Sequence, residues 1–156
     1  MVEQDIESPI PEDVISALRQ ALGENLIAVI LFGSRARGEA SLESDWDILL
    51  IADKLPHRVF SRHLLIKRAL PSSCRGAVAV LAKTPEEFEA HLSSLYLDIA
   101  LDGQIFYDPS GYARERLNSL RRQIEAAGLK RHHTPAGFCW QWEKGPRESC
   151  FLGWGP

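Results

Sequence analysis

The sequence has little of what secreted, redox-active or membrane proteins depend on. Only three cysteines occur among 156 residues, and none of them forms a CxxC pair, which argues against a disulfide framework or a thiol redox site. The longest apolar run covers residues 26–32, far short of the roughly 20 residues that cross a bilayer. The N-terminus is acidic where a signal peptide would be basic and then apolar. We therefore expect a cytoplasmic protein without a membrane partner.

An overall excess of positive charge is also absent. The formal net charge is −3 and the isoelectric point is near 6.0, so the chain as a whole does not attract polyanions, and a nucleic-acid partner is not favoured. Residues 114–131 are an exception, with six basic and two acidic side chains. A solvated helix face is the expected explanation, and a nucleic-acid surface is the alternative.

Composition and pattern together predict one layered α/β (α+β) domain. The chain is 45% hydrophobic and 25% charged, as in ordinary globular domains. Strands are predicted at 26–32, 45–52, 76–82 and 104–107, and they alternate with predicted helices. Helices are predicted from residue 11 to Gly23, with Val14, Leu18, Ala21 and Leu22 buried, at 57–70, from Pro85 onward with Phe88, Leu92, Leu95 and Ile99 on one face, and at 112–127.

The C-terminal residues differ in character from the rest. Three of the four tryptophans fall in the last 27 residues, and "FCWQW" places Phe138, Trp140 and Trp142 on one side of a predicted strand that "EKGPRE" would turn into a hairpin. We expect a domain at 1–129 and an aromatic-rich extension at 130–156 that packs over the core. A partner-binding face is the alternative, and a homo-oligomer stays open.

Two aspartates interrupt an apolar strand pattern. Asp45 and Asp47 are two residues apart, so in a strand their side chains share one face while Trp46 enters the opposite layer. Two adjacent carboxylates repel each other unless a divalent cation, which prefers hard oxygen ligands, lies between them. The pair is therefore a candidate Mg²⁺ site.

A Gly-Ser turn precedes the aspartates. Gly33 and Ser34 directly follow the predicted strand at 26–32, and unpaired N–H groups, a small glycine and a hydroxyl suit phosphate oxygens. Arg35 and Arg37 lie close enough in sequence to add positive charge. A nucleoside triphosphate with Mg²⁺ would satisfy both halves of the pattern.

The spacing Gly33-Ser34, ten residues, Asp45-x-Asp47 resembles the signature of the minimal nucleotidyltransferases of the DNA polymerase beta superfamily. The resemblance runs from about residue 11 to residue 108 and implies a mixed sheet flanked by helices. It also implies that Gly33 and Ser34 hold a triphosphate, most simply that of ATP, while Asp45 and Asp47 bind Mg²⁺ during transfer of AMP to a hydroxyl. Members are often paired with a HEPN-type protein in toxin-antitoxin operons, which implies such a partner here.

One departure from the family pattern concerns a third carboxylate on the strand before "TPEEF". Here that strand has alanine at positions 77 and 79, and loss of a base commonly lowers a rate by about 10² to 10⁴. A second hypothesis is therefore a catalytically weakened module that binds a HEPN-type partner, and a third, less favoured, is an antibiotic-modifying transferase. A zinc site from His132, His133, Cys139 and Cys150 is not favoured, because their spacing matches no known finger.

Overall fold

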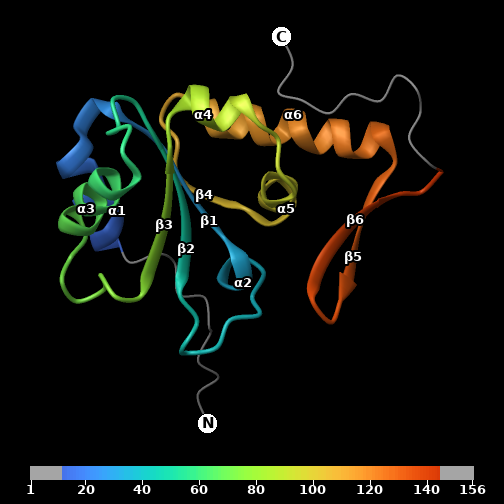
Figure 1. Cartoon of the computed structure of the whole chain (residues 1–156), viewed down its shortest axis with the longest axis horizontal. Coiled ribbons are helices and arrows are strands. Elements are labelled where there is room, and N and C mark those ends of the chain that lie inside the picture. Colours follow the sequence, from blue (N-terminus) through green and yellow to red (C-terminus); the bar gives the residue numbers. More distant parts are fainter. Residues whose placement is uncertain (1–11, 145–156) are drawn as a thin grey trace.

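A four-stranded mixed sheet forms the centre of the protein (Figure 1). The computed structural model describes residues 12–144. The strand order is β3-β2-β1-β4, in which β1 runs antiparallel to β2 and β4, and β2 runs parallel to β3. The predicted α/β fold and all four predicted strands are confirmed. Their bounds are β1 (Leu26–Phe32), β2 (Trp46–Ala52), β3 (Val78–Lys83) and β4 (Gln104–Tyr107).

Helices cover both faces of this sheet because β1 and β2 are apolar on both sides. Val29 and Leu31 of β1 pack against α1 (Glu12–Leu22) and α3 (Val59–Ala69), whereas Ala28 and Ile30 belong to the core under the other helices. These other helices are α4 (Pro85–Ala90), α5 (Ser94–Asp102) and α6 (Tyr112–Ala127). Two short elements, η1 (Gly23–Asn25) and α2 (Gly33–Ala36), lie at the two ends of β1. The sheet is thus the middle of three layers.

The first helix ends near the predicted place, with one difference in its buried stripe. Val14, Leu18 and Leu22 are buried as predicted, but Ala21 is exposed. A helix advances 100° per residue, so a stripe set by Val14, Leu18 and Leu22 leaves the position before Leu22 on the solvent side. Residue 11, where the helix was predicted to start, lies outside the described residues.

The helix predicted from Pro85 to Ile99 is two helices, so that prediction was wrong. Its start is confirmed, because Thr84 and Glu87 form a reciprocal capping box. The chain then becomes extended at His91 and Ser93, which separates α4 from α5. The break lets Phe88 and Tyr96 meet edge to face, with ring centroids 4.8 Å apart. Both rings are buried, which a single straight helix with one apolar stripe would not achieve.

Strand β3 is an edge of the sheet, and α3 covers part of its outer backbone. Lys67 donates to the carbonyl oxygen of Val78 at 3.3 Å, and Arg62 donates to that of Ala82 at 3.0 Å. Arg62 also forms two hydrogen bonds with the Glu87 carboxylate, at 2.7 and 2.9 Å. These contacts tie α3 to β3 and α4.

A second, two-stranded sheet follows α6. Strands β5 (Leu129–Thr134) and β6 (Gly137–Trp142) form an antiparallel hairpin that extends from the end of α6 (Figure 1). The strand in "FCWQW" is confirmed, but its hairpin partner precedes it, so the predicted turn at 143–148 was misplaced. Gly137 has a φ of 120°, and Thr134 donates a hydrogen bond to its carbonyl oxygen, which closes the tight turn. Residues from 145 onward lie outside the description.

The hairpin packs on the domain through its aromatic side chains. Trp140 and Trp142 join the core formed under α5 and α6, as predicted for these two residues. The predicted roles of Cys150, Phe151 and Trp154 concern residues outside the described part of the chain. Within residues 12–144, no helix has the length and apolarity that a bilayer crossing requires.

Candidate functional site

Asp47 lies where three strands meet at one end of the sheet. It is the second residue of β2, opposite Phe32 at the end of β1 and Ala79 near the start of β3. Alternation along β2 places Asp47 on the face of Leu49, while Trp46 packs into the core on the other face. The predicted separation of Trp46 and Asp47 onto opposite faces is confirmed.

Asp45 does not lie within the strand, and the expectation that it is buried there was wrong. β2 begins at Trp46, whose N–H donates to the carbonyl oxygen of Ala77 at 2.8 Å. Asp45 is exposed, whereas Asp47 is partly buried. The paired segment begins one residue later than predicted because Asp45 belongs to the loop that connects α2 to β2. The exposed position leaves the Asp45 carboxylate accessible to a ligand from solvent.

The electrostatic environment raises the pKa of Asp47. Burial is the main cause, the negative charge of Asp45 adds to it, and the positive charge of Arg37 acts in the opposite direction. Both of the raising effects penalise the ionised carboxylate. A cation between the two acids would remove the repulsion and favour the ionised form of Asp47.

Gly33 lies against the Asp47 carboxylate. A Cβ atom at position 33 would lie 2.4 Å from Oδ2 of Asp47, and Gly33 has a φ of 75°, in the left-handed region. Both features require glycine, because a larger residue would displace the carboxylate and strain the turn. The predicted proximity of the Gly-Ser turn to the acids is therefore present for Gly33 and Asp47.

Ser34 lies in the single helical turn α2, which directly follows β1. Its carbonyl oxygen accepts a hydrogen bond from the N–H of Glu39 at 2.9 Å, and the Gly33 carbonyl accepts one from Arg37 at 3.3 Å. The first N–H groups of a helical turn have no partner within that turn. The turn thus presents backbone donors next to Asp47, while its carbonyl groups hold the following loop.

Arg35 binds the protein itself. Its Nε and one terminal nitrogen both donate to the carbonyl oxygen of Ser44, at 3.0 and 2.7 Å. Its guanidinium carbon lies 4.2 Å from the centroid of a Trp46 ring. These contacts close the loop between α2 and β2 and so fix the approach of Asp45. The predicted contact of Arg35 with phosphate stays a prediction, and two of its donors already have a partner.

Arg37 belongs to a cluster that the sequence did not reveal. It pairs with Glu39 at 2.9 Å and with Asp102 at 3.7 Å. Its guanidinium carbon also lies 5.0 Å from the centroid of the Phe138 ring. Asp102 ends α5 and Phe138 lies in β6, so three segments far apart in the sequence meet here. No sequence signal links them, because neither the strand pattern nor the helix pattern says where the hairpin packs.

The strand next to the acids offers no third carboxylate. Ala79 pairs with Asp47 and is exposed, and Ala77 borders Trp46 at the start of the strand. Among residues 12–144, no three His, Cys, Asp or Glu side chains lie close enough together to hold a metal ion. Asp45 and Asp47 are thus two acids where the family pattern expects three.

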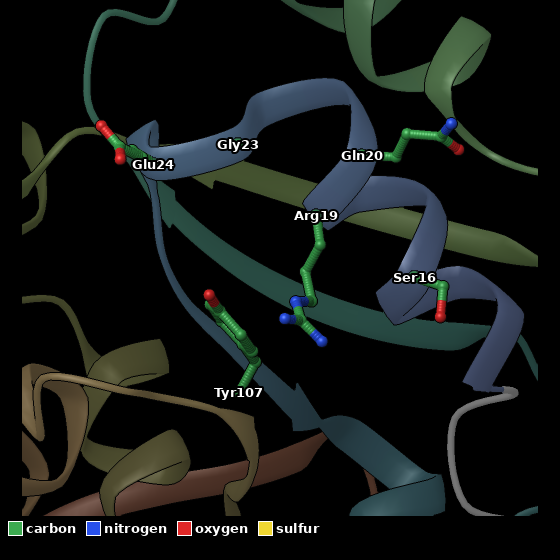
Figure 2. Close-up of a pocket in the computed structure, with 6 residues that line it drawn as sticks. All are labelled: Ser16, Arg19, Gln20, Gly23, Glu24 and Tyr107. Carbon is green, nitrogen blue, oxygen red and sulfur yellow. The ribbon is translucent and has the colours of Figure 1, made fainter.

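Two pockets border the sheet at different places. One, of about 430 Å³, lies between α3 and β3, and its lining includes Asp45, Ala79 and Lys67. The other, of about 460 Å³, lies at the opposite end of β1, between α1 and β4 (Figure 2). There the guanidinium carbon of Arg19 lies 5.3 Å from the centroid of the Tyr107 ring. Only the first pocket reaches a predicted site residue.

Known proteins resemble this chain in sequence and in fold. A protein of Methanocaldococcus jannaschii named as a putative protein adenylyltransferase is 38% identical over 66 residues, which are 42% of this chain. The alignment spans 45% of that relative, less than half of its length. This similarity covers only part of each protein.

Solved structures share the fold. A toxin-antitoxin crystal structure with AMP-PNP matches with a TM-score of 0.53 at 18% identity, covering 75% of this chain and 91% of that one. A mutant of the toxin-antitoxin MntA-HpeT matches with the same TM-score and identity, covering 74% and 89%. At this identity, the likeness concerns the fold alone.

The family model described as Polymerase beta, Nucleotidyltransferase matches residues 12–94. The match covers more than half of the chain and includes α1 to α4, the Gly33-Ser34 turn and both aspartates. Its central elements are those that place Gly33 beside Asp47 at one end of the sheet. This chain therefore belongs to the polymerase beta nucleotidyltransferase family.

Proposed function

We propose that this protein is a Mg²⁺-dependent nucleotidyltransferase that moves AMP from ATP to a hydroxyl group of a partner protein. The observation that carries the proposal is the position of Asp47 and Asp45 beside the Gly33-Ser34 turn, at one end of the sheet. A triphosphate and its metal ion need these two halves together. Family membership and the name of the Methanocaldococcus jannaschii relative support the proposal.

The donor set fits Mg²⁺ better than a softer metal. Asp45 and Asp47 supply hard carboxylate oxygens, and Mg²⁺ usually combines one or two carboxylates with phosphate oxygens and water. The repulsion between the two acids, which helps to raise the pKa of Asp47, is the charge that such an ion would compensate. When bound, the ion would neutralise phosphate charge and stabilise the charge that develops during transfer.

The residues of this chain would place the triphosphate on α2. Gly33 and Ser34 offer backbone N–H groups and a hydroxyl, and Arg37 adds a positive charge whose field already reaches Asp47. Arg35 acts indirectly by holding the loop that carries Asp45. The acceptor oxygen would attack the α-phosphorus as the bond to the β-phosphate oxygen breaks, with pyrophosphate leaving and the hydroxyl proton passing to solvent.

The acceptor side of the site is open next to β3. Ala77 and Ala79 add little bulk beside the acids, and the pocket between α3 and β3 begins at Asp45. A protein hydroxyl could therefore approach from this edge. The toxin-antitoxin structures that share the fold support a HEPN-type protein as the partner. Without a carboxylate on β3, proton removal from the acceptor would depend on solvent, and we expect slow transfer.

A labelling experiment tests the proposal. The full chain is incubated with ATP labelled at the α-phosphate, Mg²⁺ and the protein encoded by the adjacent gene, and protein-bound label is measured. We expect transfer by the wild type and none by a variant with Asp45→Asn and Asp47→Asn, which keeps the size of both side chains. An Arg68→Gln variant at the exposed end of α3 should transfer label like the wild type. Equal labelling by the wild type and the double variant would refute the proposal.

A second candidate function is a weakened module that neutralises its partner by binding alone. The observation in its favour is that alanines occupy β3 beside Asp47. The same experiment separates the two functions when partner binding is also measured. Tight binding with no label transfer, unchanged in the double variant, would favour the module.

A further inference from the structure

Phe138 connects the C-terminal hairpin to the turn that would hold the triphosphate. The guanidinium carbon of Arg37 lies 5.0 Å from the Phe138 ring centroid, and that of Arg131 lies 4.2 Å from it. A cation over an aromatic ring is attracted by the negative face of the ring. One side chain of β6 thus contacts the arginine that directly follows α2.

Asp102 joins the same two arginines. Its carboxylate accepts two hydrogen bonds from Arg131, at 2.6 and 2.9 Å, and lies 3.7 Å from Arg37. The Asp102 and Arg131 side chains are only 13% and 16% exposed, so this two-point contact is shielded from competing water. The Arg131 contacts therefore fix the Asp102 carboxylate and the Phe138 ring in one unit.

The hairpin has an additional anchor that does not involve Arg37. Nε1 of Trp140 donates to Oδ1 of Asp98 at 3.0 Å, and Asp98 also pairs with Arg131 at 3.4 Å. Trp140 itself packs into the core under α5 and α6. The hairpin is thus held to α5 independently, and it can serve as a fixed support for Arg37.

A supported arginine differs from a free one in entropy. An arginine side chain loses up to about 2 kcal/mol of rotamer freedom when it is fixed. Because Phe138, Asp102 and Glu39 already restrict Arg37, part of that loss precedes ligand binding. An anion that meets Arg37 would then bind more tightly.

We propose that the β5–β6 hairpin is part of the nucleotide site, and that Phe138 is a positioning residue that holds Arg37 beside Asp47 for contact with the triphosphate. This inference rests on the proposed function. It extends the site beyond residues 12–94, the part of the chain that matches the family model. Replacing the ring should weaken nucleotide binding by about 3- to 10-fold, the size of one partly exposed cation–aromatic contact.

Calorimetric titration with AMP-PNP and Mg²⁺ measures the effect. Phe138→Leu removes the ring but keeps an apolar residue, and we expect the 3- to 10-fold loss of affinity. Phe138→Tyr keeps the ring and should bind within 2-fold of the wild type. Trp140→Phe is the matched control, because it removes the hydrogen bond to Asp98 within the same hairpin and leaves the Arg37 contacts in place. An equal loss in Phe138→Leu and Trp140→Phe would overturn the proposal.

A double-mutant cycle tests whether Phe138 acts through Arg37. In an Arg37→Ala background the Phe138→Leu change should have no further effect on affinity, because the group it positions is absent. The same fold-loss in both backgrounds would show that Phe138 acts by another route and would overturn the proposal.

NMR of the nucleotide-free protein separates this inference from the proposed function. In the wild type, the Arg37 Nε–H signal should be shifted upfield by the Phe138 ring and should exchange slowly with water. In Phe138→Leu, the shift and the protection should be lost. A mobile, unshifted Arg37 in the wild type would overturn the inference even if the Leu variant failed to fold. Failure of the wild type to bind AMP-PNP with Mg²⁺ would instead refute the proposed function.

Discussion

Gly33 and Asp47 are in such close contact that a single carbon atom added to Gly33 would lie 2.4 Å from Oδ2 of Asp47. The contact spans the junction between the end of β1 and the start of β2, where Phe32 pairs with Asp47. The glycine and the aspartate of the family signature therefore constrain each other directly. A change at one should be felt by the other before any ligand binds.

Gly33→Ala should abolish nucleotide transfer, with Gly38→Ala as its control. Both glycines have a left-handed φ, 75° and 71°, but a Cβ at Gly38 meets nothing within 4 Å. Each alanine should therefore lower the free energy of unfolding by about 1 to 2 kcal/mol, and only Gly33→Ala should also displace the Asp47 carboxylate. Urea unfolding measures the first effect and the labelling assay measures the second. Equal transfer by the two variants would contradict this account.

Asp47 should titrate above the ordinary range of an aspartate, and Asp45→Asn should lower its pKa. Burial and the negative charge of Asp45 both raise that pKa, and the asparagine removes only the charge. In a Mg²⁺-free NMR titration of the side-chain carboxyl carbons, the wild-type midpoint should lie above 3.8 and the variant midpoint should lie lower. An Asp53→Asn variant, an exposed change at the far end of β2, should leave the midpoint unchanged. A higher midpoint in Asp45→Asn would contradict the proposed coupling.

Ala79→Asp should restore an acid beside Asp47 and raise the rate of transfer. Ala79 pairs with Asp47 in the parallel ladder and is exposed, so the new carboxylate would lie on the same face of the sheet. A base gained here should raise the rate by about 10²-fold, at the lower end of typical values. Ala79→Asn has a similar shape without the charge and should not raise the rate. The labelling assay under single-turnover conditions compares the three proteins, and equal rates would show that position 79 does not limit transfer.

Glu87→Gln should lower stability at neutral pH but not in strong acid. Arg62 holds the pKa of Glu87 at about 2, against the usual 4.5, so the ion pair stabilises the fold above pH 4.5 and is lost as the pH falls towards 2. Because the pair is partly exposed, we expect a contribution of about 1 kcal/mol at pH 7. Glutamine can still complete the capping box with Thr84.

Urea unfolding of wild type and Glu87→Gln at several pH values measures this contribution. The difference between the two proteins should be constant above pH 4.5 and should vanish near pH 2. Glu86→Gln changes the same charge at the exposed neighbouring position and should show a smaller difference. A Glu87→Gln difference that persisted at pH 2 would mean that the side chain stabilises by packing and not by charge.

Much of the fold could be predicted because local patterns determine it. Each apolar run gave a strand, and the capping residues Thr84 and Glu87 marked the start of α4. The break between α4 and α5 could not be predicted, because residues 88–99 have an acceptable helical stripe throughout. Tertiary packing of Phe88 on Tyr96 decides the matter, and a propensity pattern does not contain that information.

The candidate site was predictable only where its residues are neighbours in sequence or across paired strands. The signature spacing placed Gly33 near Asp47, and the alternation of β2 placed Trp46 on the other face. The cluster of Arg37, Asp102 and Phe138 was missed because it depends on where the hairpin packs. The contact of Arg35 with Ser44 was missed because a loop conformation has no periodic signal.

The side chains of Lys67 and Arg62 on the outer backbone of β3 have a consequence for solubility. An exposed strand edge invites a strand of another molecule to pair with it, which is the first step of many aggregates. Lys67 and Arg62 already bind two outward carbonyl oxygens there and bring charge to the rim. A second chain would have to displace both, so these two residues protect the protein from self-association in a crowded solution.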